Sequence, residues 1–217
     1  MPKWMTALEA DFGRINTRLR ALNVHDAVMT LVEGGCDLLL CYHHPRQPVQ
    51  LDPQRYDMLV LGTEALRPYA RCNRAGVPDY LLPGSIKTPL PFLSYTANAY
   101  LGRMVELILN DTKRPLHLQK CYETDMAEGL KMMAMEGHGV VFLPESSVVR
   151  EVKQRHLARA DDGQPEWQVT MEIRLYREQP SPQRPGKPLV ARLWDHLVAR
   201  QAALAKPAKR KSRSQKS

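Results

Sequence analysis

The chain has 217 residues, of which 43% are hydrophobic, so it can build a sizeable core in one large domain or two lobes and is not a disordered chain. Its apolar runs are too short to cross a bilayer, and its first residues show no signal peptide. We therefore expect a cytoplasmic protein without a membrane partner. The formal net charge is +8, but residues 206–217 hold six basic residues and no acid. This tail is expected to be disordered, and the nearly neutral body does not predict a nucleic-acid-binding surface.

Helix and strand patterns alternate along the first third of the chain, as is typical of an α/β domain. They predict a helix over residues 2–9, a half-exposed strand over 14–21, a helix over 23–33 that stops at Gly34 and Gly35, a buried strand over 36–42, and one or two strands over 58–69. Prolines and glycines then interrupt residues 72–90, where we expect the first passage between two lobes.

The second half predicts further elements in the same alternating order. They are a strand over 91–94, a helix over 97–110, a strand over 116–122, a helix from a capping box at Asp125 and Glu128 to Gly137, a strand over 140–143, a strand over 168–177 that returns to the first lobe, and a last helix from Pro188 to Pro207. This order favours two α/β lobes connected by long strands.

Three stretches together resemble the effector-binding domain of LysR-type transcriptional regulators. They are residues 25–40, residues 124–144 with the sequence Gly137-His-Gly-Val-Val-Phe-Leu-Pro144, and residues 169–205. Residues 93–103 resemble most closely the hypochlorite-responsive members of that family. The resemblance implies two Rossmann-like lobes joined by crossover strands, as in type 2 periplasmic binding proteins, with the first strand of the family missing.

The same resemblance implies a division of the chain. Residues 1–72 and 169–205 would form lobe I, residues 73–168 lobe II, and residues 206–217 a basic tail. An effector or an oxidant would change the position of one lobe relative to the other, and so the geometry of a dimer or higher oligomer. Residues 23–33 and 97–110 are the expected self-association surfaces. DNA would be bound only through a winged helix-turn-helix, which this chain lacks.

The candidate effector site lies where strands end and helices begin, because helix N-termini there offer free N–H groups to a ligand. The hydrogen-bonding candidates are Ser94, Tyr95, Thr96, Asn98, Thr124 and Asp125. For Ser94 and Thr96, ligand binding and ordinary turn chemistry are about equally supported. For Asn98 and Thr124, a capping role is favoured.

A redox signal is an alternative to a bound effector. Met126 and Met133 lie on one stripe of the predicted helix, and oxidation to the polar sulfoxide would disturb packing there. Cys72, which has Arg71 and Arg74 near it, is the rival sensor, because nearby positive charge lowers a thiol pKa. Ordinary core packing remains the alternative for each of these side chains.

The sequence gives less support to a metal site, a cofactor or an enzyme. Residues 41–44, Cys-Tyr-His-His, have no second ligand pair and are interpreted as a polar loop, so neither a metal nor a cofactor is expected. No nucleophile–base constellation or phosphate-binding motif is present, and an enzyme is not expected. The remaining alternative is a small-solute-binding protein of the periplasmic type, which shares the two-lobed architecture.

Overall fold

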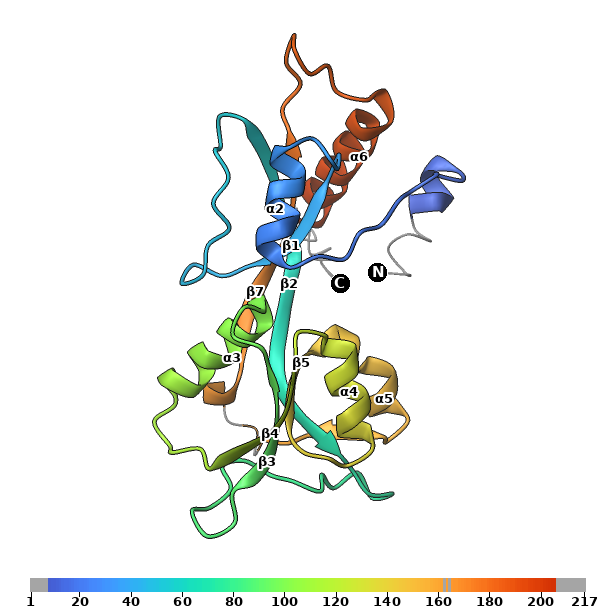
Figure 1. The fold of residues 1–217 in the computed structure, drawn as a ribbon. Coiled ribbons are helices and arrows are strands. Elements are labelled where there is room, and N and C mark those ends of the chain that lie inside the picture. Colours follow the sequence, from blue (N-terminus) through green and yellow to red (C-terminus); the bar gives the residue numbers. More distant parts are fainter. Residues whose placement is uncertain (1–7, 162, 164, 206–217) are drawn as a thin grey trace, which may run out of the picture.

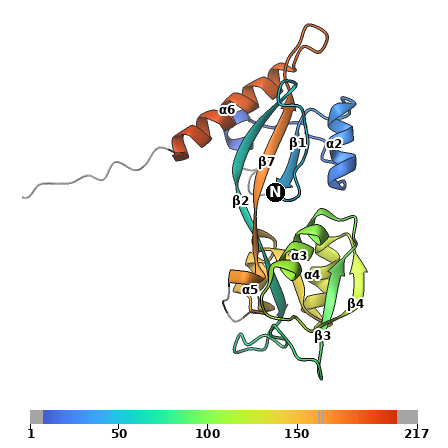
Figure 2. The same cartoon turned by 90° about the vertical axis from the view of Figure 1, so that its left-hand side faces the viewer.

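The computed structural model describes residues 8–161, 163 and 165–205 and shows two α/β lobes, one above the other (Figure 1). Two long strands connect them: β2 (Tyr56–Arg71) and β7 (Val169–Glu178). They pair antiparallel from Tyr56↔Glu178 to Leu66↔Val169, with a register shift between Val60 and Gly62. Figure 2 shows both strands passing side by side from one lobe toward the other.

Lobe I is built on the antiparallel order β1-β7-β2, with β1 spanning Leu39–His43. Helix α2 (Val24–Val32) and helix α6 (Pro188–Ala205) belong to this lobe. Residues 8–12 are helical, which agrees with part of the helix expected near the N-terminus. Within the described residues, no strand precedes α2.

The strand expected over residues 14–21 is absent, and that prediction is wrong. Residues 13–23 form neither helix nor strand, although their side chains alternate in polarity. A strand needs a neighbouring strand for its backbone N–H and C=O groups, and none of the described strands pairs with the segment.

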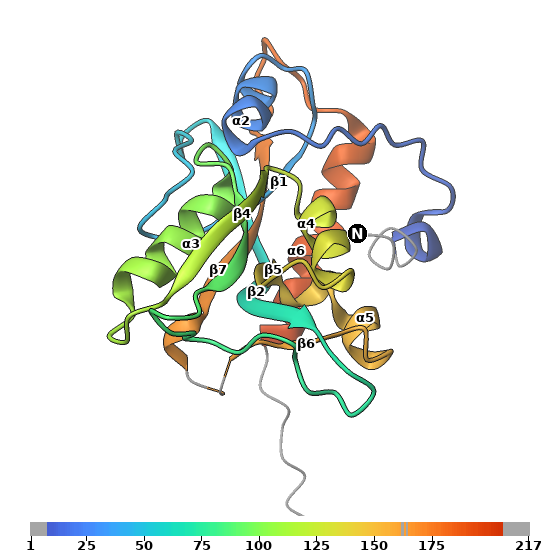
Figure 3. The same ribbon diagram turned by 60° about the horizontal axis from the view of Figure 1, so that its bottom comes forward.

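Lobe II combines the second half of β2 with a parallel pair of strands. The pair is β3 (Leu90–Tyr95) and β4 (Leu118–Thr124), and a parallel bridge joins Phe92 to Val140. The remaining elements are α3 (Tyr100–Asp111), α4 (Ala127–Met135), β5 (Val141–Pro144), α5 (Val149–Lys153), β6 (Leu157–Arg159), and 3-10 turns at Glu145–Ser147 and Pro165–Trp167. Figure 3 shows α3 and α4 on either side of β3 and β4.

The passage between the lobes lies inside β2 and not in residues 72–90. From Leu66 onward β2 leaves β7 and pairs with β5, and from Tyr69 it also pairs with β6. Residues 73–89 then stay in lobe II, where the N–H of Leu82 donates to the carbonyl of Ala160 (2.8 Å). The expectation failed because proline and glycine mark a loop without showing which lobe it belongs to.

Glycine stops end α2 and α4 as predicted. Gly34 and Gly137 both have positive φ, +77° and +86°. The N–H groups of Gly35 and His138, one residue further on, donate back to the carbonyls of Thr30 (2.8 Å) and Met133 (3.1 Å). This is the Schellman arrangement, which a glycine adopts without strain.

The capping box predicted for α4 is wrong. The helix begins at Ala127, its N-cap residue is Met126, and no side chain caps it. Asp125 therefore lies one residue before the cap, and Glu128 pairs with Lys131 instead (2.8 Å). The Thr124 hydroxyl accepts the N–H of Met126 (3.3 Å) and so holds the turn that the box was expected to hold.

The core divides along the two lobes. The largest apolar cluster fills lobe II around Leu93, Met104 and Phe142, and two smaller clusters lie in lobe I. Among the described residues, no helix has the length and apolar character needed to span a membrane. The last helix was expected to end at Pro207, which lies, like the predicted basic tail, outside the described residues.

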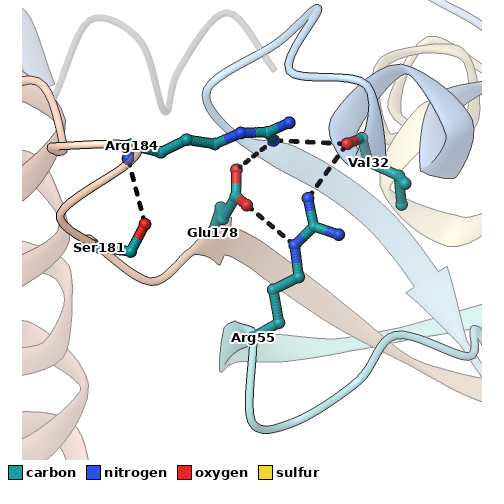
Figure 4. Close-up of polar contacts among 5 residues, drawn as sticks. All are labelled: Val32, Arg55, Glu178, Ser181 and Arg184. Carbon is teal, nitrogen blue, oxygen red and sulfur yellow. Dashed lines mark hydrogen bonds and ion pairs between the residues drawn. The ribbon is translucent and has the colours of Figure 1, made fainter.

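An ion cluster fastens the end of lobe I that lies farthest from lobe II (Figure 4). Glu178, at the end of β7, accepts from Arg55 (2.9 Å) and Arg184 (2.8 Å). Both guanidiniums also donate to the carbonyl of Val32, the last residue of α2, at 3.4 and 3.5 Å. Cations at a helix C-terminus stabilise it, so the cluster fixes α2 against the sheet.

Candidate functional site

The carboxyl ends of β3 and β4 bring most of the predicted effector residues together. Ser94 is in register with Glu123 and Tyr95 with Thr124, and the N–H of Thr96 donates to the carbonyl of Thr124 (3.2 Å). Parallel strands end at one edge of a sheet, which is the usual ligand position in open α/β folds. This strand-end site comprises residues 94–98 and 123–126.

Ser94 and Tyr95 form the buried floor of the strand-end site. The Ser94 hydroxyl, 3% exposed, donates to the carbonyl of Tyr95 (3.1 Å) and lies 3.5 Å from the Glu123 carboxylate. The Tyr95 hydroxyl donates to the carbonyl of Phe142 (3.0 Å), and burial raises the pKa of Tyr95. Both side chains are satisfied inside the protein, so their hydrogen bonds fix the site's shape.

The accessible part of the strand-end site consists of Thr96, Asn98, Thr124 and Asp125. Asn98 and Asp125 are exposed, and the two threonines are half-buried. Helices α3 and α4 start beside these residues, and neither has a side chain bonded to its first N–H groups. Such N-termini carry partial positive charge, so an anionic or hydrogen-bond-accepting group is the ligand that fits here.

Lobe I contributes contacts that the sequence did not predict. The hydroxyl of Tyr100, the first residue of α3, donates to the carbonyl of Gln47 in lobe I (3.1 Å). Arg46 forms an ion pair with Asp111 at the other end of α3. These contacts join segments more than 50 residues apart, and no local pattern in the sequence marks them. They clamp α3 to the loop that follows β1.

A buried carboxylate lies where β2 leaves lobe I. Glu64 is 6% exposed and accepts from the N–H (3.1 Å) and the hydroxyl of Ser146, in the 3-10 turn after β5. Burial and the nearby Glu64 raise the pKa of Tyr42 to about 12. Glu64 therefore links the crossover strand to lobe II by charge-assisted hydrogen bonds, and no local pattern in the sequence marks this role.

The two predicted methionine sensors differ in accessibility. Met126 is 64% exposed at the N-cap of α4, within the strand-end site. Met133, two turns later, is half-buried against the core of lobe II, and Leu130 between them is fully buried. An oxidant in solution reaches Met126 directly, whereas oxidation of Met133 would place a polar sulfoxide against apolar neighbours.

Cys72 lies apart from the strand-end site, in a cavity of about 300 Å³ that Arg71, Met135 and His156 help to line. Burial and the nearby Asp79 raise the pKa of Cys72, and its thiol donates to the carbonyl of Arg155 (3.2 Å). Arg71, the residue expected to lower this pKa, is paired with Asp79 (2.6 Å), so the role of Cys72 as a sensor stays a prediction. A thiol with a raised pKa is a poor oxidant sensor.

Cys36 and Cys41, and the histidines His43 and His44, have structural positions. Burial raises the pKa of Cys41 to about 11, and burial also raises that of Cys36. His43 and His44 each accept a backbone N–H, from Val49 (3.4 Å) and Arg46 (3.3 Å). Residues 41–43 are nevertheless the last residues of β1, and His44 forms a bridge to Gln47, so the interpretation of residues 41–44 as a polar loop is wrong. No group of potential metal ligands occurs among the described residues.

A second cavity, of about 430 Å³, lies between the C-terminal end of α3 and the first residues of β4. Phe92, Leu109 and Leu118 line it, together with Arg114 and Lys120. Both cations are already paired, Arg114 with Glu166 (2.5 Å) and Lys120 with Glu123 (2.8 Å). The cavity lies at the opposite end of the strands from the strand-end site.

Comparison with known proteins gives one consistent result. The model of the LysR substrate binding domain matches residues 1–202. The solved regulatory domain of HypT from Salmonella typhimurium, in its apo form, is 26% identical, with a TM-score of 0.75 over 92% of this chain and 89% of that one. Full-length HypT from the same organism, described as a hypochlorite-specific LysR-type transcriptional regulator, is 28% identical, with a TM-score of 0.71 over 87% and 60% of the two chains.

Curated relatives agree with the structural matches. The HTH domain-truncated transcriptional regulator QseD of Escherichia coli O157:H7 is 27% identical over 139 residues, which are 64% of this chain and 54% of that protein. The chain spans about half the length of the curated relatives it matches. The family match favours a LysR-type regulator over the alternative of a periplasmic-type small-solute-binding protein. The chain belongs to the LysR substrate-binding domain family, whose members are the regulatory domains of LysR-type transcription regulators.

Proposed function

We propose that this chain senses a small anionic effector or an oxidant at the strand-end site and converts it into a change in lobe geometry. One observation carries the proposal. The N-termini of α3 and α4, which no side chain caps, lie beside Thr96, Thr124 and Met126 at the edge of lobe II that faces lobe I. A signal bound or formed there changes the free energies of the two lobe arrangements unequally, and so shifts their populations.

The oxidant version of the proposal rests on Met126. Hypochlorite would transfer its oxygen to the thioether sulfur: the S–O bond forms, the O–Cl bond breaks, chloride leaves with the electron pair, and sulfur is oxidised by two electrons. The new S=O group is a strong hydrogen-bond acceptor beside the first N–H groups of α4. Related HypT is hypochlorite-specific, and one of its solved forms is a methionine-to-glutamine variant.

Peptide mapping after sub-stoichiometric hypochlorite tests this proposal, with Met132 as the matched control. Met132 is 52% exposed, close to the 64% of Met126, but lies in the last turn of the same helix. The positive end of the helix attracts the hypochlorite anion and the negative end repels it. We expect sulfoxide at Met126 in several-fold excess over Met132.

Equal oxidation of the two methionines would show that exposure alone governs the reaction and would remove Met126 as a specific sensor. The effector version is then tested separately, by thermal shift with small carboxylates. A carboxylate that binds the strand-end site should raise Tm in the unsubstituted chain and lose its effect in Thr96→Val. If no carboxylate raises Tm, the effector version fails.

The proposed partners follow from the same role. They are a small effector or oxidant, other copies of this chain through α2 and α3, and DNA through the winged helix-turn-helix of a LysR-type regulator. Residues 1–72 with 169–205, and residues 73–168, are the proposed lobe divisions, except that the second half of β2, from Leu66 onward, pairs within lobe II. A cytoplasmic location is proposed with them.

A further inference from the structure

The open edge of β1 is the first of two unusual features in lobe I. One edge of β1 pairs with β7 over five residues, and no described strand pairs with the other edge. Apolar clusters nevertheless cover both faces of the strand: Leu39 is buried beside Leu31 of α2, whereas Leu40 packs toward Trp194 of α6. A row of unpaired N–H and C=O groups between two apolar layers is a template for another strand.

This edge is held in place and ready for pairing. Helix α2, which covers one face of β1, is fixed at its C-terminus by the cluster of Arg55, Glu178 and Arg184 (Figure 4). Pairing with β7 fixes the strand itself. An added strand would therefore not have to order β1 first, which reduces the entropic cost of binding.

Residues 14–22 are the second feature. Ile15, Thr17, Leu19 and Ala21 alternate with Arg14, Asn16, Arg18 and Arg20, which is the pattern of a strand with one apolar face. The segment nevertheless makes no hydrogen bond to another described residue. All its side chains except Ile15 are exposed, Leu19 to 75%. The segment is a potential strand that has no sheet to join.

Both ends of the segment are anchored within the same chain. Before it, the ring of Phe12 packs edge-on against His196 of α6, with 5.1 Å between centroids. After it, Val24 begins α2 and packs against the core of lobe II. The segment crosses from one anchor to the other without joining the sheet (Figure 1), so β1 of the same chain does not use it.

We propose that residues 14–22 of one copy add as a strand to the open edge of β1 in a second copy, and that the exchange is reciprocal. Charge supports a second copy as the occupant. Residues 14–22 hold three arginines and no acid, whereas residues 23–43, which contain α2 and β1, hold Asp26, Glu33 and Asp37 and no lysine or arginine. Reciprocal exchange closes with two-fold symmetry and leaves neither edge open.

Hydrogen–deuterium exchange of the full chain at low and high protein concentration tests the proposal. Exchange of the amides of residues 14–22 and 39–43 should slow together, by about tenfold or more, as concentration rises and the strands pair. Self-association through α2 and α3 alone would leave residues 14–22 unprotected, and that result would overturn the proposal. Protection independent of concentration would indicate pairing within one chain and would also overturn it.

Leu19→Pro provides the matched variant, with Ile86→Pro as its control. Within sheets, proline is confined to positions whose N–H would face solvent, and residues 14–22 make no described backbone bond that this change could break. Ile86 is 83% exposed in a lobe II loop. Leu19→Pro should abolish the concentration-dependent protection of residues 39–43, and Ile86→Pro should retain it. Equal protection in both variants would contradict strand exchange.

Discussion

At the residue scale, Lys131 shows how a buried positive charge is held in α4. Its ammonium is buried, and it bonds to Glu128 (2.8 Å), to Glu151 (3.3 Å) and to the carbonyl of Ser147 (3.3 Å). Burial opposes the charged form, but the hydrogen bonds to the two carboxylates raise the pKa of Lys131 above its usual value. The lysine thus ties α4 to α5 and to the turn that carries Ser146.

The carboxylates of Glu128 and Glu151 should contribute differently to the free energy of unfolding. The Glu151 side chain is 16% exposed, whereas that of Glu128 is 67% exposed. We expect Glu151→Gln to lower the free energy of unfolding by about 1–3 kcal/mol, because it weakens a charge-assisted bond in a poorly solvated site. Urea denaturation at neutral pH measures the change.

Glu128→Gln is the control on the same lysine. Solvent screens an exposed ion pair, so the expected loss is under about 0.5 kcal/mol. The pKa of Glu151 is lowered in the folded protein, so its stabilisation is present above the carboxyl's unfolded pKa and is lost as pH falls through the lower folded value. Equal losses for the two variants at neutral pH would contradict this account.

At the element scale, the packing of α3 on the end of β3 shapes the strand-end site. A Cβ on Gly102 would lie 2.5 Å from the carbonyl oxygen of Thr96 and 3.1 Å from the Cβ of Tyr95. Only a residue without a side chain lets the helix approach the strand end this closely. The position of Thr96 therefore depends on a glycine two residues into the helix.

Gly102→Ala should destabilise the fold by about 1–3 kcal/mol, since backbone has to move to relieve the contact. Gly129→Ala is the matched control, because that glycine also lies inside a helix but a Cβ there meets nothing closer than 3.8 Å. Alanine there should leave stability unchanged or raise it by up to about 1 kcal/mol. Urea denaturation of both variants makes the comparison, and equal stabilities would refute the packing argument.

Local patterns predicted most elements correctly. Apolar stripes, the glycine stops of α2 and α4, and Pro188 in the first turn of α6 are properties of neighbouring residues, and the structure confirms these elements. The failures depend on distant partners. The pattern of residues 14–21 is that of a strand, but a strand also requires a neighbour, and the crossing inside β2 depends on its pairing with β5 and β6.

The candidate site was predictable only in part. Strand ends followed by helix starts located residues 94–98 and 124–126, because this order is visible in the sequence. The clamp of Tyr100 on Gln47 and the bond of Glu64 to Ser146 join segments 53 and 82 residues apart. Such contacts follow from the assembled fold and have no local signal.

At the scale of the whole molecule, the lobes share two continuous strands and a small number of polar contacts. β2 and β7 run between them without a break, so the lobes can change their relative angle only by bending or twisting these strands. The contacts of α3 with residues 46–47, and of Glu64 with Ser146, resist that motion. Under the proposed function, a change at the start of α3 or α4 would alter the strain on these contacts and so favour one angle.

Measuring the distance between the lobes tests this claim directly. Spin labels on Met29→Cys in lobe I and Ile86→Cys in lobe II, both exposed, report it in a chain whose four native cysteines are replaced by alanine. Glutamine imitates the polar sulfoxide, so Met126→Gln should shift the distance distribution, whereas Met132→Gln should leave it unchanged. A distribution that is the same in the parent and both variants would contradict the account.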